Sequence, residues 1–303
     1  MPTSHRIVLL IIAIGAVPLR AQTVDDGLLV PRRALMTGFL YAHESWTNYW
    51  EGSLNRDNGN VGTVTTQSAR WVAGYGVTDR LSVIAMLPYV WTHASQGPLH
   101  GMEGVQDFTL AAKFRLLETP WTDHGTLRAI VVGSAGIPAS NYTPDFLPLS
   151  IGQASRQFSG RFTLNYKAHR GWFINGSTAY TWRATVTLDR PAYYTNGQLF
   201  LSDEVDMPNV FDYTVSAGYQ GGRLFIPIGF SQQLTLGGGD IRRQDMPFVS
   251  NRMDFVRIEG GLMYALRAPK ELALRVGANH VVSGRNVGEA TTLMAGVFYT
   301  FHL

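Results

Sequence analysis

Apolar and polar residues alternate along the last thirteen positions of the chain. Read with a period of two, one face carries Thr291, Leu293, Ala295, Val297, Tyr299, Phe301 and Leu303, and the other carries Thr292, Met294, Gly296, Phe298, Thr300 and His302. Successive side chains of a β-strand point to opposite faces, so this pattern predicts a strand with one apolar side and one more polar side. The strand carries none of the charges or prolines that usually protect an exposed sheet edge. We therefore expect it to pair with another strand.

The same two-residue period recurs upstream and predicts about twelve strands. They lie at about 33–50, 63–77, 81–92, 107–116, 126–138, 158–167, 172–183, 211–219, 224–231, 252–266, 272–279 and 291–303. Long connections such as 51–62 and 188–206 alternate with tight turns such as 78–80, 169–171 and 220–222. This alternation is typical of transmembrane antiparallel up-and-down β-barrels, which have short turns on one side of the membrane and longer loops on the other. A large soluble all-β protein is the alternative.

Composition favours the barrel. Aromatic residues make up 12% of the chain and charged residues only 16%, against about 25% charged residues in typical soluble domains. The mean hydropathy of −0.01 is too polar for a helical membrane protein, but it suits a barrel with an apolar outside and a polar inside. The chain has no cysteine and a net charge of +3 without a basic run, so we expect no thiolate metal site, no bound cofactor and no nucleic-acid partner.

The N-terminus resembles an export signal. His5 and Arg6 precede an apolar run from Ile7 to Val17, and Ala21 allows cleavage before Gln22. The run is shorter than the roughly 20 residues that a membrane-spanning helix needs, which argues against the alternative of an N-terminal anchor. We expect residues 1–21 to be a signal peptide and residues 22–303 to form a single outer-membrane barrel domain.

Large aromatic residues recur near strand ends on the apolar faces. They are Tyr75, Tyr89, Trp91, Trp172, Trp182, Tyr219, Tyr264 and Tyr299. Tyrosine and tryptophan prefer the two membrane–water interfaces, where barrels carry aromatic girdles. We therefore interpret these eight residues as girdle positions.

The polar faces hold most of the charged residues of the predicted strands. They carry the bases Arg70, Lys113, Arg115, Arg161, Lys167, Arg183, Arg257 and Arg275, and the acids Glu44, Asp107, Asp212 and Glu259. A lysine or arginine on the lipid face costs roughly 2–4 kcal/mol at the bilayer centre, so these residues are predicted to line the lumen. Their excess of bases indicates either a passage that prefers anionic or polar solutes or a self-neutralising set of charges that fills a closed interior.

Catalysis is another hypothesis to consider. Some outer-membrane hydrolases use a histidine two residues before a serine nucleophile, and His43–Ser45 and His93–Ser95 have this spacing. One such pair is expected by chance among eight histidines, and no orienting asparagine is evident. We predict no catalytic and no metal site.

Two stretches resemble a known family. Residues 104–115, GVQDFTLAAKFR, are similar to a G-x-x-D-x-x-L-x-x-K-[YF]-R stretch of the outer-membrane family named for the meta-pathway of phenol degradation. Leu87-Pro88-Tyr89, after the turn at 75–81, fits the same family pattern. The resemblance covers residues 70–117 well. It implies a barrel of about this size that moves small hydrophobic or aromatic molecules, whereas an arginine-rich bore favours anions.

Together these patterns predict an outer-membrane channel or transporter for passive passage of small molecules, aromatic or anionic. Its expected partners are outer-membrane lipid, a small-molecule solute, and the barrel-assembly machinery through the C-terminal strand. Two alternatives remain open. One is a non-conducting structural or adhesive barrel that acts through loops 51–62 and 188–206, and the other is a barrel hydrolase.

Overall fold

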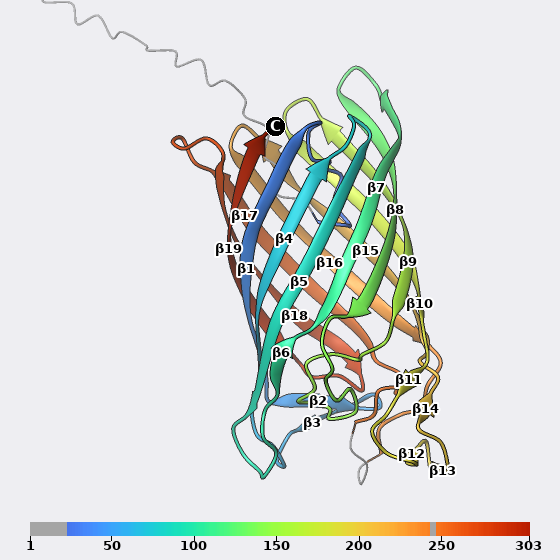
Figure 1. The fold of residues 1–303 in the computed structure, drawn as a ribbon. Coiled ribbons are helices and arrows are strands. Elements are labelled where there is room, and N and C mark those ends of the chain that lie inside the picture. Colours follow the sequence, from blue (N-terminus) through green and yellow to red (C-terminus); the bar gives the residue numbers. More distant parts are fainter. Residues whose placement is uncertain (1–22, 243–246) are drawn as a thin grey trace, which may run out of the picture.

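The computed structural model describes residues 23–242 and 247–303, so the predicted signal peptide at 1–21 lies outside the described residues. Twelve long antiparallel strands form the body of the protein (Figure 1). They are β1 (Ala34–Trp46), β4 (Val64–Gly76), β5 (Leu81–Ala94), β7 (Asp107–Pro120), β8 (Gly125–Pro138), β9 (Gln157–Ala168), β10 (Trp172–Arg183), β15 (Asn209–Gly221), β16 (Leu224–Leu236), β17 (Asp254–Ala265), β18 (Leu272–Arg285) and β19 (Thr291–His302). The predicted all-β, twelve-stranded fold is confirmed.

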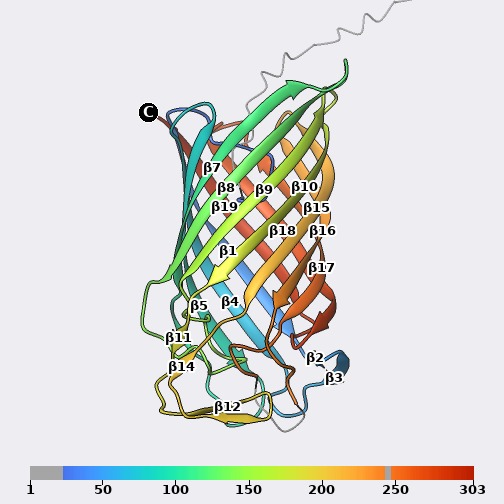
Figure 2. The ribbon, with the colours of Figure 1, turned by 90° about the vertical axis from the view of Figure 1, so that its right-hand side faces the viewer.

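The sheet closes into a barrel because the last long strand pairs with the first. β19 runs antiparallel to β1 from Ala34 opposite His302 to Ser45 opposite Thr291, and β1 also pairs with β4 along its length. β4 in turn pairs with β5, so every long strand has two neighbours and no edge is exposed. Figures 1 and 2 show the resulting tilted cylinder from two sides. The predicted pairing of residues 291–303 is thereby confirmed.

The two rims of the barrel differ. Connections of two to six residues, at 77–80, 121–124, 169–171, 222–223 and 266–271, lie at one rim. The other rim carries the longer loops 47–63, 95–106, 139–156, 184–208 and 237–253, with the five-residue connection 286–290. Short turns face the periplasm in outer-membrane barrels, so we name the two rims the periplasmic and the extracellular rim.

The extracellular loops contain short paired strands (Figure 2). β2 (Asn48–Glu51) pairs with β3 (Leu54–Asp57), β11 (Val186–Thr187) with β14 (Glu204–Val205), and β12 (Tyr193–Thr195) with β13 (Gln198–Phe200). The prediction that the first strand extends to Trp50 is wrong. The barrel strand ends at Trp46, and residues 48–57 fold back as a hairpin in which Trp50 packs against Val281 and Ala290.

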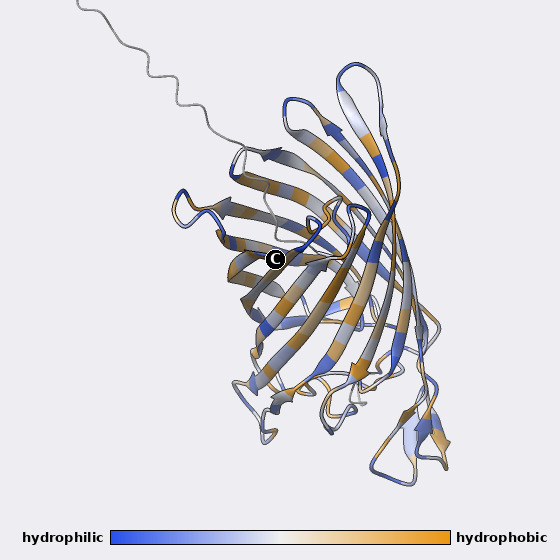
Figure 3. Cartoon of the chain, turned by 45° about the horizontal axis from the view of Figure 1, so that its top comes forward, coloured by the Kyte–Doolittle hydropathy of each residue, from blue (hydrophilic) through white to orange (hydrophobic). Residues whose placement is uncertain are grey.

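The outer face of the barrel is apolar. Phe39, Trp172, Ile174, Ile228 and Leu293 are each more than half exposed, and Figure 3 shows hydrophobic positions recurring along the strands. Since apolar surface of this extent is stable only against lipid, the face defines the membrane-spanning belt. The described residues include no helix long and apolar enough to cross a membrane.

The wall departs from regular pairing beside Pro88. β5 pairs with β7 only from Leu81 opposite Phe114 to Met86 opposite Thr109. Beyond this point a short strand, β6 (Glu103–Val105), takes the place of β7 opposite Tyr89 to Trp91. Proline lacks an amide hydrogen, and here only its carbonyl takes part in the ladder, accepting from the Gln106 amide at 2.9 Å. The sheet is therefore irregular beside this proline.

Candidate functional site in the barrel lumen

The segment before β1 lies inside the barrel. Residues 23–28 line the lumen cavity, and the following residues return to the wall, where the Val30 amide donates to Ser82 Oγ at 2.9 Å. The Arg33 amide then donates to the Gly76 carbonyl at 2.8 Å. A Cβ at Gly76 would lie 1.9 Å from the Pro31 carbonyl oxygen, so glycine permits this close approach. We call residues 23–33 the lumen segment.

A buried ion pair holds the lumen segment. Lys113 on β7 is fully buried, and its Nζ donates to Asp26 Oδ1 at 2.7 Å and to the Thr23 carbonyl at 2.8 Å. Asp26 also accepts from the Thr23 and Leu28 amides. On the other side, Asn175 Nδ2 donates to the Asp25 carbonyl at 2.9 Å. A charge removed from water is stable only when it is paired and hydrogen-bonded, and Asp26 supplies that pairing for Lys113.

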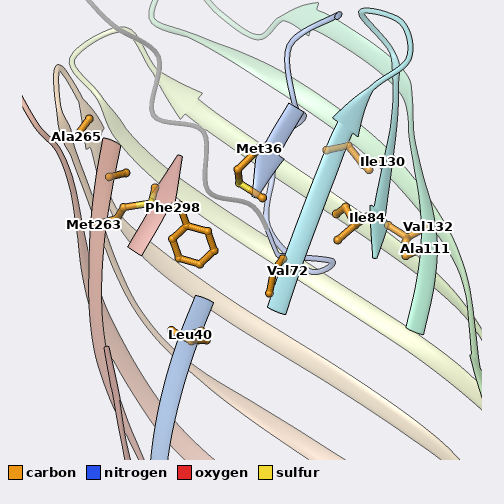
Figure 4. Close-up of a cluster of buried hydrophobic side chains, with 11 residues drawn as sticks. Met36, Leu40, Val72, Ile84, Ala111, Ile130, Val132, Met263, Ala265 and Phe298 are labelled. Carbon is orange, nitrogen blue, oxygen red and sulfur yellow. The ribbon is translucent and has the colours of Figure 1, made fainter. Parts of the chain in front are cut away.

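A cavity of about 590 Å³ remains beside the lumen segment. This volume falls in the range of small-molecule pockets, roughly 300–1,000 Å³. Its apolar lining includes Leu40, Val72, Ile84, Met86, Met263, Met294 and Phe298, and Figure 4 shows several of these side chains around the same interior space. On the opposite wall Phe173 and Phe225 stack with ring centroids 5.3 Å apart. The lumen is thus partly hydrophobic, which the excess of charged residues in the sequence does not indicate.

The structure brings seven of the twelve predicted lumen residues to this cavity, namely Glu44, Arg70, Arg161, Asp212, Arg257, Glu259 and Arg275. Arg161 Nη2 lies 2.7 Å from Asp212 Oδ1, and Arg257 Nε lies 3.5 Å from Glu259 Oε2. These pairs neutralise part of the interior charge within the wall itself.

The other five predicted residues lie elsewhere. Lys113 pairs with Asp26, and Arg115 pairs with Glu118 near the periplasmic rim. Lys167 lies near the same rim, within electrostatic range of Arg128. At the extracellular end, Asp107 accepts from Tyr142, and Arg183 Nε is buried without a hydrogen-bond partner in the described chain.

The lumen segment changes the charge balance of the bore. Asp25 and Asp26 bring two carboxylates into an interior where the wall strands carry more bases than acids. Sequence reasoning missed both residues because an aspartate pair outside a strand has no period that assigns it to a face. The available signal was that two acidic residues stand a few positions before the first strand of a barrel whose predicted lumen is basic.

An inward-folded loop narrows the extracellular mouth. The Tyr142 hydroxyl donates to Asp107 Oδ1 at 2.5 Å and accepts from the Ala154 amide at 2.9 Å. Thr92 Oγ1 donates to the Leu149 carbonyl at 2.7 Å, and Leu149 is fully buried against Val61 and Val64. Burial, followed by the neighbouring Asp107 carboxylate, raises the pKa of Tyr142 above its usual value, so the hydroxyl keeps its proton and donates. Loop 139–156 is therefore anchored to the wall.

The predicted aromatic residues lie at both rims. Tyr75, Trp172, Tyr219, Tyr264 and Tyr299 lie near the periplasmic ends of their strands, and Tyr89, Trp91 and Trp182 lie near the extracellular ends. Trp172 and Tyr219 meet edge to face at 5.7 Å, and Phe158 joins Trp182 at 5.7 Å. Their assignment as interfacial girdles stays a prediction.

The two histidine–serine pairs show no catalytic arrangement. Ser95 Oγ accepts from the Thr63 amide at 2.8 Å, and in the described residues no hydrogen bond joins His93 to Ser95 or His43 to Ser45. The described residues also contain no cluster of histidine and acidic side chains suited to a metal ion.

A closed twelve-stranded barrel with an apolar belt, two unlike rims and a partly open interior defines an outer-membrane β-barrel. The sequence over residues 54–295 matches the family described as putative MetA-pathway of phenol degradation, and the chain belongs to this family. None of the curated proteins matches the sequence.

Solved structures share the fold. A COG4313 outer membrane channel from Pseudomonas putida F1 superposes with a TM-score of 0.70 at 15% identity, covering 93% of this chain and 100% of that chain. The monoaromatic hydrocarbon channel CymD is more distant, with a TM-score of 0.42 at 9% identity over 90% of this chain and 89% of that chain. The first of these likenesses supports the fold.

Proposed function

We propose that this protein is an outer-membrane channel through which small, largely apolar molecules, aromatic ones among them, cross passively. The observation that carries the proposal is the lumen cavity. It is large enough for a single aromatic ring with substituents, and Leu40, Met294 and Phe298 give it an apolar side. Membership of a family named for phenol degradation agrees with an aromatic cargo.

The apolar lining has a physical consequence for selection. A hydrophilic solute would lose water contacts beside these side chains without regaining hydrogen bonds, at a cost of roughly 1–3 kcal/mol per unpaired group. An aromatic ring instead gains from leaving water, at about 25 cal/mol per Å² of buried apolar surface. The cavity therefore favours aromatic over sugar-like solutes of equal size.

A second candidate, a non-conducting structural barrel, is favoured by one observation. The lumen segment lies inside the barrel and is anchored to its wall, so it takes up part of any passage. The decisive question is whether solute crosses the barrel at all.

Uptake by whole cells answers it, because lipopolysaccharide slows the direct diffusion of apolar molecules that confounds simple liposomes. The protein is expressed in a Gram-negative host that has few porins, and the initial uptake rate of radiolabelled phenol is measured. A matched pair of variants probes the route. Met294 lines the cavity, whereas its neighbour Leu293 faces outward and is 58% exposed.

We expect the parent protein to raise phenol uptake, Met294→Trp to reduce the gain several-fold by filling the cavity, and Leu293→Trp to leave it unchanged. Heat-modifiable migration in gels controls for folding. Uptake equal to that of host cells without the protein would reject the channel and favour the structural barrel.

A further inference from the structure

Three arginines converge from one arc of the barrel wall. Arg70 lies on β4, Arg257 on β17 and Arg275 on β18, and all three line the lumen cavity. The charges of Arg257 and Arg275 act on Arg70, although β1 and β19 lie between β4 and β18 in the sheet. The charge of Glu44 also acts on Arg70, and Glu259 interacts with Arg257 and Arg275. Two carboxylates therefore face three arginines in a partly apolar interior, and an anion would compensate the positive charge left in excess.

Two of these arginines have unused donors. Arg257 donates to Ser231 Oγ at 2.8 Å and pairs with Glu259. In the parts of the chain that the structure describes, neither Arg70 nor Arg275 makes a hydrogen bond or ion pair with another protein group. Each guanidinium carries five N–H donors in a planar fork that matches a carboxylate. Both side chains are partly exposed to the cavity, so their donors are accessible to a solute.

The wall between these two arginines is apolar. Leu40 on β1 lies opposite Arg70 on one side and opposite Gly296 of β19 on the other, and Gly296 lies opposite Arg275. A leucine and a glycine therefore separate the two cations along the sheet. Phe298 projects into the same space, two residues beyond Gly296 (Figure 4). A Cβ at Gly296 would lie 2.9 Å from Leu40 Cδ1 and 3.2 Å from Phe298 Cε2, so these two side chains close over the glycine and form one apolar surface beside the arginines.

The charges of the opposite arc orient an anion toward the arginines. That arc and the lumen segment hold Lys113 and Arg161 together with the carboxylates of Asp25, Asp26 and Asp212. The arginine arc holds Arg70, Arg257 and Arg275 with the carboxylates of Glu44 and Glu259. One arc therefore has a positive charge in excess and the other a negative charge in excess, so the field across the lumen drives an anion to the arginine side.

We infer that the lumen cavity binds aromatic monocarboxylates, with the carboxylate between Arg70 and Arg275 and the ring against Leu40 and Phe298. The inference rests on the proposed function, because it names the solute class of the same lumen. A neutral aromatic molecule fills the apolar part and leaves the arginines unsatisfied. A carboxylate on the ring satisfies both, and charge-assisted bidentate hydrogen bonds are the strongest that arginine forms.

Equilibrium dialysis of the purified, folded protein in detergent tests the site. The probes are radiolabelled benzoate and benzyl alcohol, which share the ring but differ in charge, at neutral pH and low ionic strength. We expect benzoate to bind at least about tenfold more tightly than benzyl alcohol, since a hydrogen bond to a charged group is worth roughly ten- to hundredfold in a binding constant. Octanoate distinguishes an aliphatic from an aromatic carboxylate, and it is expected to bind more weakly than benzoate.

Variants locate the anion. Arg70→Gln and Arg275→Gln should each weaken benzoate binding about tenfold or more and leave benzyl alcohol unaffected, while Arg70→Lys should restore part of the benzoate affinity. Arg170→Gln, in the exposed turn between β9 and β10, is the matched control and should change neither. Arg70→Lys retains a cation at the site, so it keeps the test decisive if the glutamine variant misfolds.

The outcomes separate the inference from the function on which it rests. Equal affinity for benzoate and benzyl alcohol, or benzoate binding unchanged in both glutamine variants, would overturn the carboxylate site and leave a channel for neutral aromatics standing. Tight, arginine-dependent benzoate binding without phenol or benzoate uptake by cells would instead uphold the site and reject the channel.

Discussion

Loss of the Asp26 carboxylate should release the lumen segment from the barrel. Asp26 faces the fully buried Lys113 at 2.7 Å, a separation at which two unit charges attract by roughly 6 kcal/mol for an effective dielectric constant of about 20. Part of this attraction offsets desolvation of the two charges, and removing one partner of a buried pair costs about 3–5 kcal/mol. Asp26→Asn should therefore raise the population of the displaced segment by roughly two to nearly four orders of magnitude.

The absence of cysteine from the chain provides a clean assay. Val24 is partly buried against the interior apolar cluster, so Val24→Cys places a single thiol that maleimide reaches faster when the segment moves out. The labelling rate of this protein is compared with that of the Val24→Cys/Asp26→Asn protein, and Asp57→Asn on the exposed β3 serves as the control. Labelling should accelerate strongly with Asp26→Asn and remain at the parent rate with Asp57→Asn. Equal rates in all three proteins would refute the ion pair as the anchor.

Three further predictions follow from other contacts. Gly76→Ala should lower the free energy of unfolding by about 1–3 kcal/mol, because its Cβ would overlap the Pro31 backbone. The urea midpoint of heat-modifiable migration measures this loss of stability, and an unchanged midpoint would contradict the prediction. Tyr142→Phe removes the donor to Asp107 and the acceptor for Ala154, so proteolysis of loop 139–156 should become faster, and resistance equal to the parent would argue against this anchor. The hydrogen bond from Arg285 lowers the pKa of Asp240 below its usual value. Because the pKa is lowered on folding, ionised Asp240 stabilises the folded loop at pH values above its unfolded pKa of roughly 4. Protection of loop 237–253 from hydrogen exchange should therefore persist at neutral pH and decline as the pH falls through the folded pKa of Asp240. In Asp240→Asn this pH dependence should be lost.

The strands were predictable because lipid imposes a strict rule on every second residue. Phe108, Leu110 and Phe114 face outward and Lys113 inward, as their alternation in the sequence indicates. A one-residue slip would turn each charged side chain toward lipid, so the sequence pattern and the observed faces agree. The closing pair of β1 and β19 follows from the same requirement that a membrane barrel leaves no edge unpaired.

The interior was less predictable because its contacts are long-range. Lys113 finds its partner 87 residues earlier in the sequence, in a segment without periodicity. The continuation of residues 33–46 to Trp50 was also wrong, since the alternation persists through the turn at Thr47 while the chain reverses into a hairpin. Periodicity indicates on which face of the sheet a residue lies, but it does not indicate which distant group the residue contacts across the lumen.

Single-channel conductance tests the central claim, that this barrel is a channel whose lumen holds its own N-terminal segment. The parent protein and a variant that lacks residues 23–30 are compared in planar bilayers at the same salt concentration. We expect small or intermittent steps for the parent and larger, steadier steps for the deletion, with a shift toward anion selectivity because Asp25 and Asp26 leave the bore. A deletion variant that folds, shows heat-modifiable migration and yet stays electrically silent would contradict the account.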